Sequence, residues 1–270
     1  METVLAKDFR ASASGDEAAG AAFPRWLTPL LAATCGLVAA NIYYSQPLVG
    51  EISGSLGLPP QLAGLIVSLT QIGYGIGLFF VVPLGDLLEN RRLVVVLLVA
   101  TIAALLGAAI SQTVAPFLLS ALFIGIASVA VQVLVPYAAH LAPKGRQGQV
   151  VGNIMGGLML GIMLARPAAS FITSLFSWHA VFLFSAMVLT VLVIVLRLVL
   201  PPRRPEAKLS YGRLLASMGE LMLTTPELQR RSVYQACMFG AFTLFWTTAP
   251  LLLTDVYGFT QAGIALFALA

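Results

Sequence analysis

Long uncharged stretches dominate the chain from residue 26 onward. Seven of them contain no Asp, Glu, Lys or Arg: 26–50, 52–85, 93–143, 147–165, 167–196, 232–254 and 256–270. A helix that crosses a bilayer needs about 20 apolar residues. The longest stretch is long enough for two such helices, and Ser111, Gln112, Thr113 and Pro116 mark the turn between them. The pattern predicts seven spans, over 27–48, 61–83, 93–111, 115–139, 148–171, 178–200 and 233–254. It predicts that an eighth span begins near residue 261.

Composition places the chain among all-α integral membrane proteins. Of its 270 residues, 59% are hydrophobic and 10% are charged, and the mean hydropathy is +0.93. A soluble domain carries about 25% charged residues, so this chain has too few to cover a soluble surface. The apolar runs are continuous rather than alternating, which argues against a β-barrel. The net charge of +4 is too small to indicate nucleic-acid binding, and Cys35 and Cys237 are interpreted as packing residues because each lies within an apolar run.

Basic residues gather on one side of the predicted membrane. Thirteen of the 15 Lys and Arg residues fall in the tail 1–25, in the loops after spans two and four, and in the segment after span six. Cytoplasmic segments carry such an excess, which predicts a cytoplasmic N-terminus. The tail has no apolar core of the kind found in signal peptides, so it is predicted to be disordered and cytosolic. Residues 201–231 are predicted to form a cytosolic linker with an amphipathic helix over 209–223.

A weak internal repeat indicates how the first six spans are arranged. One pattern of two glycines and a proline recurs at an offset of 84 residues: Gly73, Gly77 and Pro83 in span two, and Gly157, Gly161 and Pro167 in span five. The same offset maps span one onto four and span three onto six. Units of three spans must cross the membrane in opposite directions, as inverted repeats do in large transporters. The predicted fold is therefore a six-helix N-terminal bundle of inverted 3+3 repeats over 26–200, followed by the incomplete start of a C-terminal bundle over 232–270.

Polar side chains are unevenly distributed among the spans. Spans three and six are almost entirely apolar, which predicts peripheral positions, whereas spans one, four and seven carry amides that need partners or a water-filled path. Polar and aromatic groups together suit a pocket for amphipathic ligands. Interhelical packing with satisfied amides accounts for the same residues, and the sequence leaves both interpretations open. The candidate substrate-binding residues are Asn41, Tyr44, Gln71, Gln132, Arg166 and Trp246.

Arg166 is a charged residue well inside a predicted span. An arginine at the centre of a span costs about 2.5–3.5 kcal/mol on insertion scales. It precedes Pro167, which interrupts the backbone hydrogen bonds, and the freed carbonyls are expected to accept bonds from the guanidinium. In one interpretation Arg166 faces the interior and pairs with a polar group or an anionic part of a substrate. In the other it reaches outward to the headgroups.

Two further motifs have both a functional and an ordinary interpretation. Span five has small residues at every fourth position, Gly157, Gly161 and Ala165. This spacing predicts close packing of the span against another helix. An acid at the inner end of span two is disfavoured by the helix dipole, so it needs nearby cations or the N-terminus of another helix. The candidate conformational latch consists of Asp86, Arg91 and Arg92, and the alternative is an ordinary charged loop.

The loop after span two, Gly85-Asp86-Leu87-Leu88-Glu89-Asn90-Arg91-Arg92, resembles the signature of the major facilitator superfamily at this place, although Glu89 replaces the usual glycine. Residues 41–48 are similar to members that export drugs or sugars. Span five is similar to the exporter signature, except that Arg166 replaces a glycine. The resemblance implies a twelve-span efflux transporter of the plasma membrane, in bacteria the inner membrane, with this chain as its N-terminal portion and a C-terminal half to follow.

The function that the resemblance implies is secondary-active, proton-coupled efflux of small amphipathic organic compounds by alternating access. The expected partners are a small-molecule substrate, protons and the lipid bilayer. The sequence contains no P-loop, HExxH, CxxC or catalytic triad pattern, so neither ATP use, enzymatic activity, a cofactor nor a metal is predicted. Two alternatives are a membrane receptor or assembly subunit that does not transport, and a nonfunctional fragment.

Overall fold

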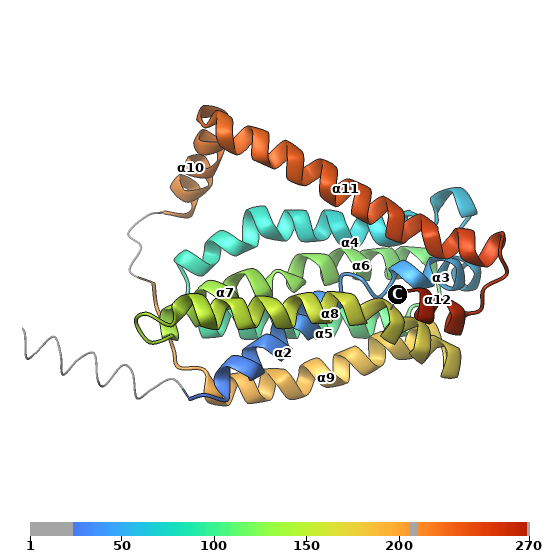
Figure 1. Cartoon of the computed structure of the whole chain (residues 1–270), viewed down its shortest axis with the longest axis horizontal. Helices are drawn as coiled ribbons and strands as arrows, with labels where there is room; N and C mark the ends of the chain where they lie inside the picture. Colours follow the sequence, from blue (N-terminus) through green and yellow to red (C-terminus); the bar gives the residue numbers. More distant parts are fainter. Residues whose placement is uncertain (1–23, 206–209, 269–270) are drawn as a thin grey trace, which may run out of the picture.

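The computed structural model describes residues 24–205 and 210–268, so the predicted tail lies outside the described residues except for its last two (Figure 1). Regular structure in the described part is helical. Six of its segments are long and apolar enough to cross a membrane, which confirms the all-α membrane fold: 60–86, 90–110, 114–141, 147–175, 178–199 and 226–255. The α-helices are α2 (Leu27–Ala40), α3 (Val49–Leu56), α4 (Leu65–Ile76), α5 (Asn90–Ile110), α6 (Val114–Ser128), α7 (Ala130–Leu141), α8 (Gln147–Leu175), α9 (Trp178–Val199), α10 (Tyr211–Thr224), α11 (Pro226–Asp255) and α12 (Gln261–Phe267).

The first predicted span, 27–48, is not one continuous helix. After α2 the chain turns irregularly through residues 41–45 into a short 3-10 turn, η1 (Gln46–Leu48), and then into α3. Two local causes act together. The Asn41 side-chain amide donates to the carbonyl oxygens of Leu37 and Val38 at 3.0 and 3.2 Å, which competes with backbone pairing. Pro47 has no N–H with which to continue the helix.

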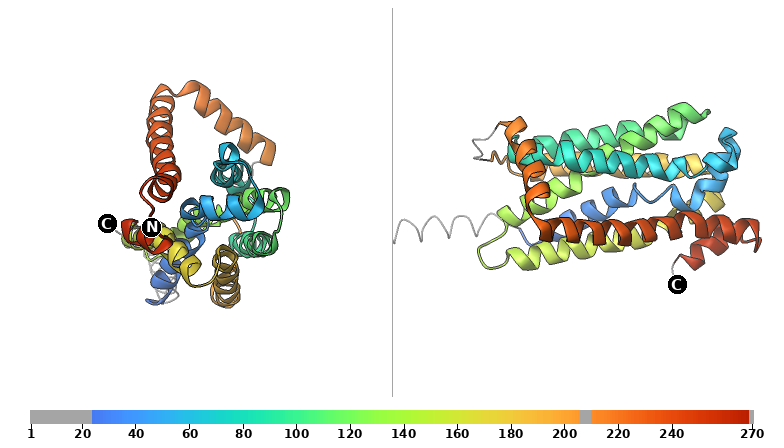
Figure 2. Two further views of the ribbon diagram at one scale, coloured as in Figure 1. Left: turned by 90° about the vertical axis from the view of Figure 1, so that its right-hand side faces the viewer. Right: turned by 90° about the horizontal axis from the view of Figure 1, so that it is seen from above.

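The helix pairs follow the two-fold relation that the repeat predicts. Span one (α2) packs chiefly on span five (α8), and span two (α4) packs chiefly on span four (α6 with α7). The third extensive contact joins span three (α5) to span six (α9). Exchanging spans one and four, two and five, and three and six turns this set of pairs into itself. In Figures 1 and 2 these helices form one bundle, and the pairing is that of inverted repeats.

Glycines bring the paired helices into backbone contact at both equivalent places. A Cβ on Gly157 would lie 2.6 Å from the carbonyl oxygen of Ala32 in α2, and one on Gly161 would collide with the backbone of Gly36. In the other repeat, a Cβ on Gly77 would lie 2.6 Å from the carbonyl oxygen of Ile126. Small residues at these positions therefore allow the close approach by which helices associate within lipid.

Helix α11 approaches the bundle near its C-terminal end and diverges from it toward α10 (Figure 1). Pro250 is buried, and the Leu251 side chain would contact a Cβ placed on Gly50 at 3.7 Å. Toward the other end, Tyr234 and Met238 are 62% and 72% exposed. Helix α10 lies where the linker helix over 209–223 is predicted, and its ends agree with that prediction to within two residues. Its Tyr211 hydroxyl donates to the carbonyl oxygen of Phe80 at 2.7 Å.

The close contact between α2 and α8 predicts different effects at two adjacent glycines. Gly157→Val should destabilise the protein by about 1–3 kcal/mol because its side chain would collide with Ala32. Gly156→Val should change the stability little, since a Cβ there meets nothing within 4 Å. Thermal unfolding of the two purified variants measures the difference, and equal melting temperatures would contradict this packing.

Candidate functional site

Arg166 lies in the interior of the protein, with 3% of its surface exposed. Its Nε donates to Gln46 Oε1 at 2.9 Å, which joins α8 to η1 at the break in the first span. Its Nη1 donates to the carbonyl oxygen of Ile162 at 3.4 Å. The carbonyl that Pro167 would free is that of Met163, so the acceptor is the neighbouring carbonyl and not the expected one. The guanidinium is therefore held within the bundle.

Three aromatic rings surround this guanidinium. Its central carbon lies 4.1 Å from the ring centre of Trp246, and 5.0 Å from those of both Tyr43 and Phe242. The rings of Tyr43 and Phe242 also meet edge to face, with their centres 6.2 Å apart. Cation–π contacts of this kind strengthen when water is excluded. We call these side chains the Arg166 cluster, which consists of Tyr43, Gln46, Arg166, Phe242 and Trp246.

The cluster joins the two parts of the chain. Tyr43 and Gln46 come from the break in the first span and Arg166 from the middle of α8, whereas Phe242 and Trp246 come from α11. A continuous helix over 27–48 would not have produced this turn. The break therefore places two of the five members, and the convergence of α11 on the bundle places two others.

The cluster contains two buried hydrogen-bond donors without a partner, Arg166 Nη2 and Gln46 Nε2. Gln46 is fully buried. Among the described residues no carboxylate lies within ion-pair distance of Arg166. A buried cation without a counter-ion is costly in an apolar surrounding. The cluster therefore favours a negatively charged or strongly accepting neighbour.

The other predicted substrate-binding residues lie outside this cluster. Asn41 Oδ1 accepts a bond from the Ser185 hydroxyl at 2.6 Å, which joins spans one and six. Gln132 Nε2 donates to the Tyr74 hydroxyl at 3.0 Å, between spans four and two. Tyr44 is buried, and the two polar side-chain atoms of Gln71 have no partner. Of the six predicted residues, the structure brings Arg166 and Trp246 together in the cluster, while Asn41 and Tyr44 both contact the Ser185 side chain.

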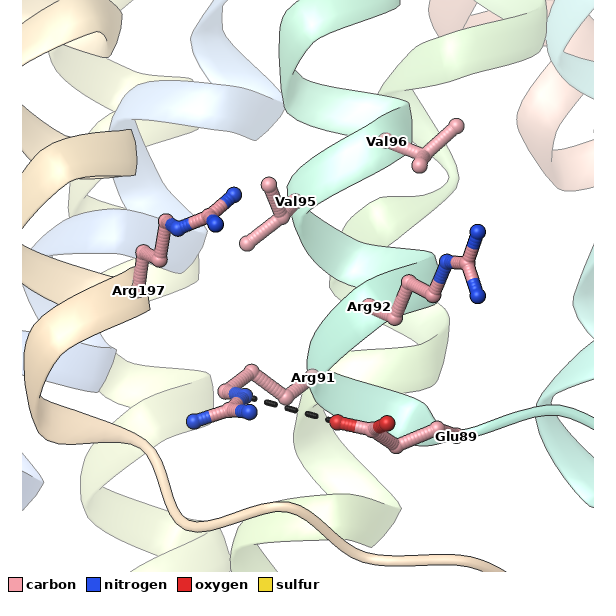
Figure 3. A pocket seen from close by; sticks show the side chains of 6 residues that line it. All are labelled: Glu89, Arg91, Arg92, Val95, Val96 and Arg197. Carbon is pink, nitrogen blue, oxygen red and sulfur yellow. Dashed lines mark ion pairs between the residues drawn. The ribbon is translucent and has the colours of Figure 1, made fainter.

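The predicted latch residues lie where span two ends and span three begins: Asp86 is the last residue of η4 (Val82–Asp86), and Arg91 and Arg92 are in the first turn of α5 (Figure 3 shows the two arginines). Arg91 and Arg92 line a cavity of about 620 Å³ with Glu89, Val95, Val96 and Arg197. Arg91 Nε lies 3.4 Å from Glu89 Oε1, and its Nη1 donates to the carbonyl oxygen of Leu200 at 3.2 Å. Asp86 is exposed and forms no ion pair with any described residue. The acid that pairs in this conformation is therefore Glu89, at the position where the family signature has glycine.

Asn90, which the sequence analysis did not single out, joins this loop to the segment after span six. Its Nδ2 donates to the carbonyl oxygen of Gly85 at 2.7 Å, and its Oδ1 accepts from Arg203 Nη1 at 2.9 Å. Its backbone N–H donates to the carbonyl oxygen of Arg203 at 2.9 Å. The Tyr137 hydroxyl donates to the carbonyl oxygen of Pro201 nearby. An amide between an acidic and a basic residue, Glu89 and Arg91, gives no signal of such contacts in the sequence.

Fold and site together define the class of protein. It is an all-helical membrane protein whose first six spans form inverted repeats, and α11, the helix that follows them, contacts these spans through the Arg166 cluster. A family model described as Major Facilitator Superfamily matches residues 31–270. The chain therefore belongs to the Major Facilitator Superfamily, a family of transporters, and it is not an enzyme.

Two curated relatives and one solved structure agree with this assignment. The Uncharacterized transporter YgaY of Escherichia coli O157:H7 is 37% identical over 84% of this chain and 58% of its own length. The Probable transporter SCO4007 of Streptomyces coelicolor is 36% identical over 96% of this chain and 61% of its own length. A bacterial homolog of the human lysosomal transporter Spinster, in an inward-facing and unoccupied conformation, shares the fold with a TM-score of 0.69 at 13% identity, over 90% of this chain and 59% of that one. The chain thus spans about three fifths of the length of each.

The loop contacts predict different stabilities for two neighbouring substitutions. Asn90→Ala should destabilise the protein by about 1–3 kcal/mol, because it removes the partners of a buried carbonyl and of Arg203. Asp86→Asn should change the stability by less than about 0.5 kcal/mol, because Asp86 is exposed and unpaired. Thermal unfolding compares them, and a larger loss for Asp86→Asn would refute this account of the loop.

Proposed function

We propose that the protein is a secondary-active transporter that exports small amphipathic organic compounds in exchange for protons by alternating access. The observation that carries the proposal is the Arg166 cluster, which connects the six-span bundle to α11 at one end while α11 stands apart at the other. Alternating access requires two units that separate at one side of the membrane and meet at the other. The family assignment supports the same mechanism.

The proposed orientation follows from the distribution of charge. The end at which α11 diverges carries α10 and the basic residues Arg91, Arg92 and Arg203, so by the positive-inside rule it faces the cytoplasm. The Arg166 cluster then closes the path toward the outside. In a bacterium this places the protein in the inner membrane, with substrate entering from the cytosol or the inner leaflet.

We further propose that polar residues between the spans line the path on the open side. Gln132 and Tyr74 are hydrogen-bonded to each other, and Gln132 is exposed. Gln71 presents two unpaired polar atoms from the same helix as Tyr74. Asp86, Arg91 and Arg92 act as the latch at the cytoplasmic end, where the ion pair of Arg91 with Glu89 must rearrange if Asp86 is to gain a cation.

Coupling to protons rests on the resemblance to exporters. The carboxylates of the described residues nearest the membrane, Glu51, Asp86 and Asp255, lie at or near the ends of helical segments. We therefore propose that the group that binds the proton in the complete gene product is not one of these. The pH gradient is then the quantity whose removal should stop transport.

A reversible crosslink at the closed end tests the mechanism. Gly50→Cys with Leu251→Cys, in a background without other cysteines, should be joined by a short bifunctional thiol reagent because the two side chains would be in contact. In vesicles containing the complete gene product, export of a panel of cationic, neutral and anionic amphipathic dyes should saturate and should need a pH gradient. The crosslink should reduce it at least about tenfold.

Each single-cysteine variant, treated with the same reagent, provides the matched control and should transport normally. Reduction or removal of the crosslink should restore export. Undiminished export with the crosslink in place would contradict opening at this end. No saturable, gradient-dependent flux for any dye in the uncrosslinked protein would contradict the transporter proposal itself.

A further inference from the structure

We infer that the Arg166 cluster binds an organic oxyanion, such as a carboxylate carried on an apolar or aromatic body. The inference rests on the proposed function and narrows its substrate class. Nothing in the resemblance points to it, because Arg166 stands where the exporter signature has a glycine. It follows from the two unpaired donors of the cluster, from its uncompensated charge and from the arrangement of its rings.

The orientation of the Gln46 amide is fixed by chemistry. Arg166 Nε can only donate a hydrogen bond, so the Gln46 atom that lies 2.9 Å from it must be the oxygen. The amide nitrogen of Gln46 is then left without a partner, and so is Arg166 Nη2. Nε and Nη2 point their hydrogens to the same edge of a guanidinium. One unpaired donor, Arg166 Nη2, therefore lies on the same edge of the guanidinium as Nε. The other, Gln46 Nε2, belongs to the amide that is bonded to Nε at that edge.

An oxyanion satisfies both donors and the charge. Arginine forms strong, charge-assisted hydrogen bonds to carboxylate and phosphate oxygens. Because Nε is already bonded to Gln46 Oε1, the donors offered to the oxyanion here are Arg166 Nη2 and Gln46 Nε2. Water would satisfy the hydrogen bonds but would leave the positive charge of Arg166 without a counter-ion. Because no described carboxylate pairs with Arg166, the missing negative charge is expected from a ligand.

The aromatic rings around the guanidinium suggest the rest of the ligand. The ring centres of Trp246, Tyr43 and Phe242 lie 4.1–5.0 Å from its central carbon. Since Phe242 and Trp246 belong to α11, they move with that helix when the closed end opens, and an apolar body attached to the oxyanion can then pack against the same rings.

The test uses three ligands of the same shape on the complete gene product in detergent micelles: 3-phenylpropionate, its neutral amide and 3-phenylpropylamine. Binding is followed by melting temperature and by tryptophan fluorescence, since Trp246 lies on the guanidinium. The carboxylate should bind at least about tenfold more tightly than the amide or the amine. Equal binding of the three would overturn the inference, and equal protection by sodium nitrate at the same ionic strength would overturn the assignment of an organic ligand.

Substitution of Gln46 provides a test that does not depend on losing Arg166. Gln46→Glu places a carboxylate against the guanidinium, so it should raise the melting temperature without ligand and abolish the preference for phenylpropionate. Gln149→Glu, on the exposed start of α8, is the matched control and should do neither. Arg166→Gln should also abolish the preference, whereas Arg197→Gln should keep it because Arg197 lies at the far end of α9. A Gln46→Glu protein that is destabilised or that still prefers the anion would contradict the site.

Binding and transport separate this inference from the proposed function. If wild-type vesicles export cationic or neutral dyes but show no preference for anions, the transporter proposal stands and the oxyanion site is wrong. If phenylpropionate binds in the predicted way while no ligand is exported, the site stands and the proposal of transport is wrong.

Discussion

A polar group inside a bilayer has no water to bind, and this constraint organises the chain. The Asn41 side chain bonds both to the end of its own helix and to Ser185. The turn that follows positions Gln46, whose oxygen accepts from Arg166. The break in the first span and the buried cation therefore depend on each other: a continuous helix would leave Arg166 without Gln46, and an apolar residue at 166 would leave the Gln46 oxygen unpaired.

Much of the architecture could be predicted from the sequence because lipid leaves few choices. Uncharged runs of sufficient length must be helices, and the glycine pattern at an offset of 84 residues, as in Gly77 and Gly161, indicated which helices approach closely. The interruption after Ala40 was missed. Hydropathy averages over a window and does not register an asparagine that competes for backbone carbonyls or a proline that follows it.

The candidate site could be predicted only in part. Arg166 was identifiable because a charge within a span is costly, and Trp246 because aromatic residues recur along one face of α11. Gln46 is one of the amides that mark span one as polar, but its contact with Arg166 and the role of Tyr43 follow from the irregular turn and have no signal in the sequence. Tyr44, the neighbour of Tyr43, was selected instead, and a difference of one residue in a turn changes the direction of the side chain. Partners distant in sequence, such as Asn90 and Arg203, are invisible without the fold.

The central claim is that the Arg166 cluster marks the end at which the two units meet, and that the opposite end opens when this one closes. Distances between paired spin labels, measured by electron paramagnetic resonance, test it most directly. One pair, at Gln149 and Tyr234, lies near the starts of α8 and α11, and the other, at Leu175 and Val256, lies at their ends; all four residues are exposed. On changing the pH or adding ligand, the account predicts that one distance lengthens as the other shortens. Distances that stay fixed at both ends, or that change in the same direction, would contradict it.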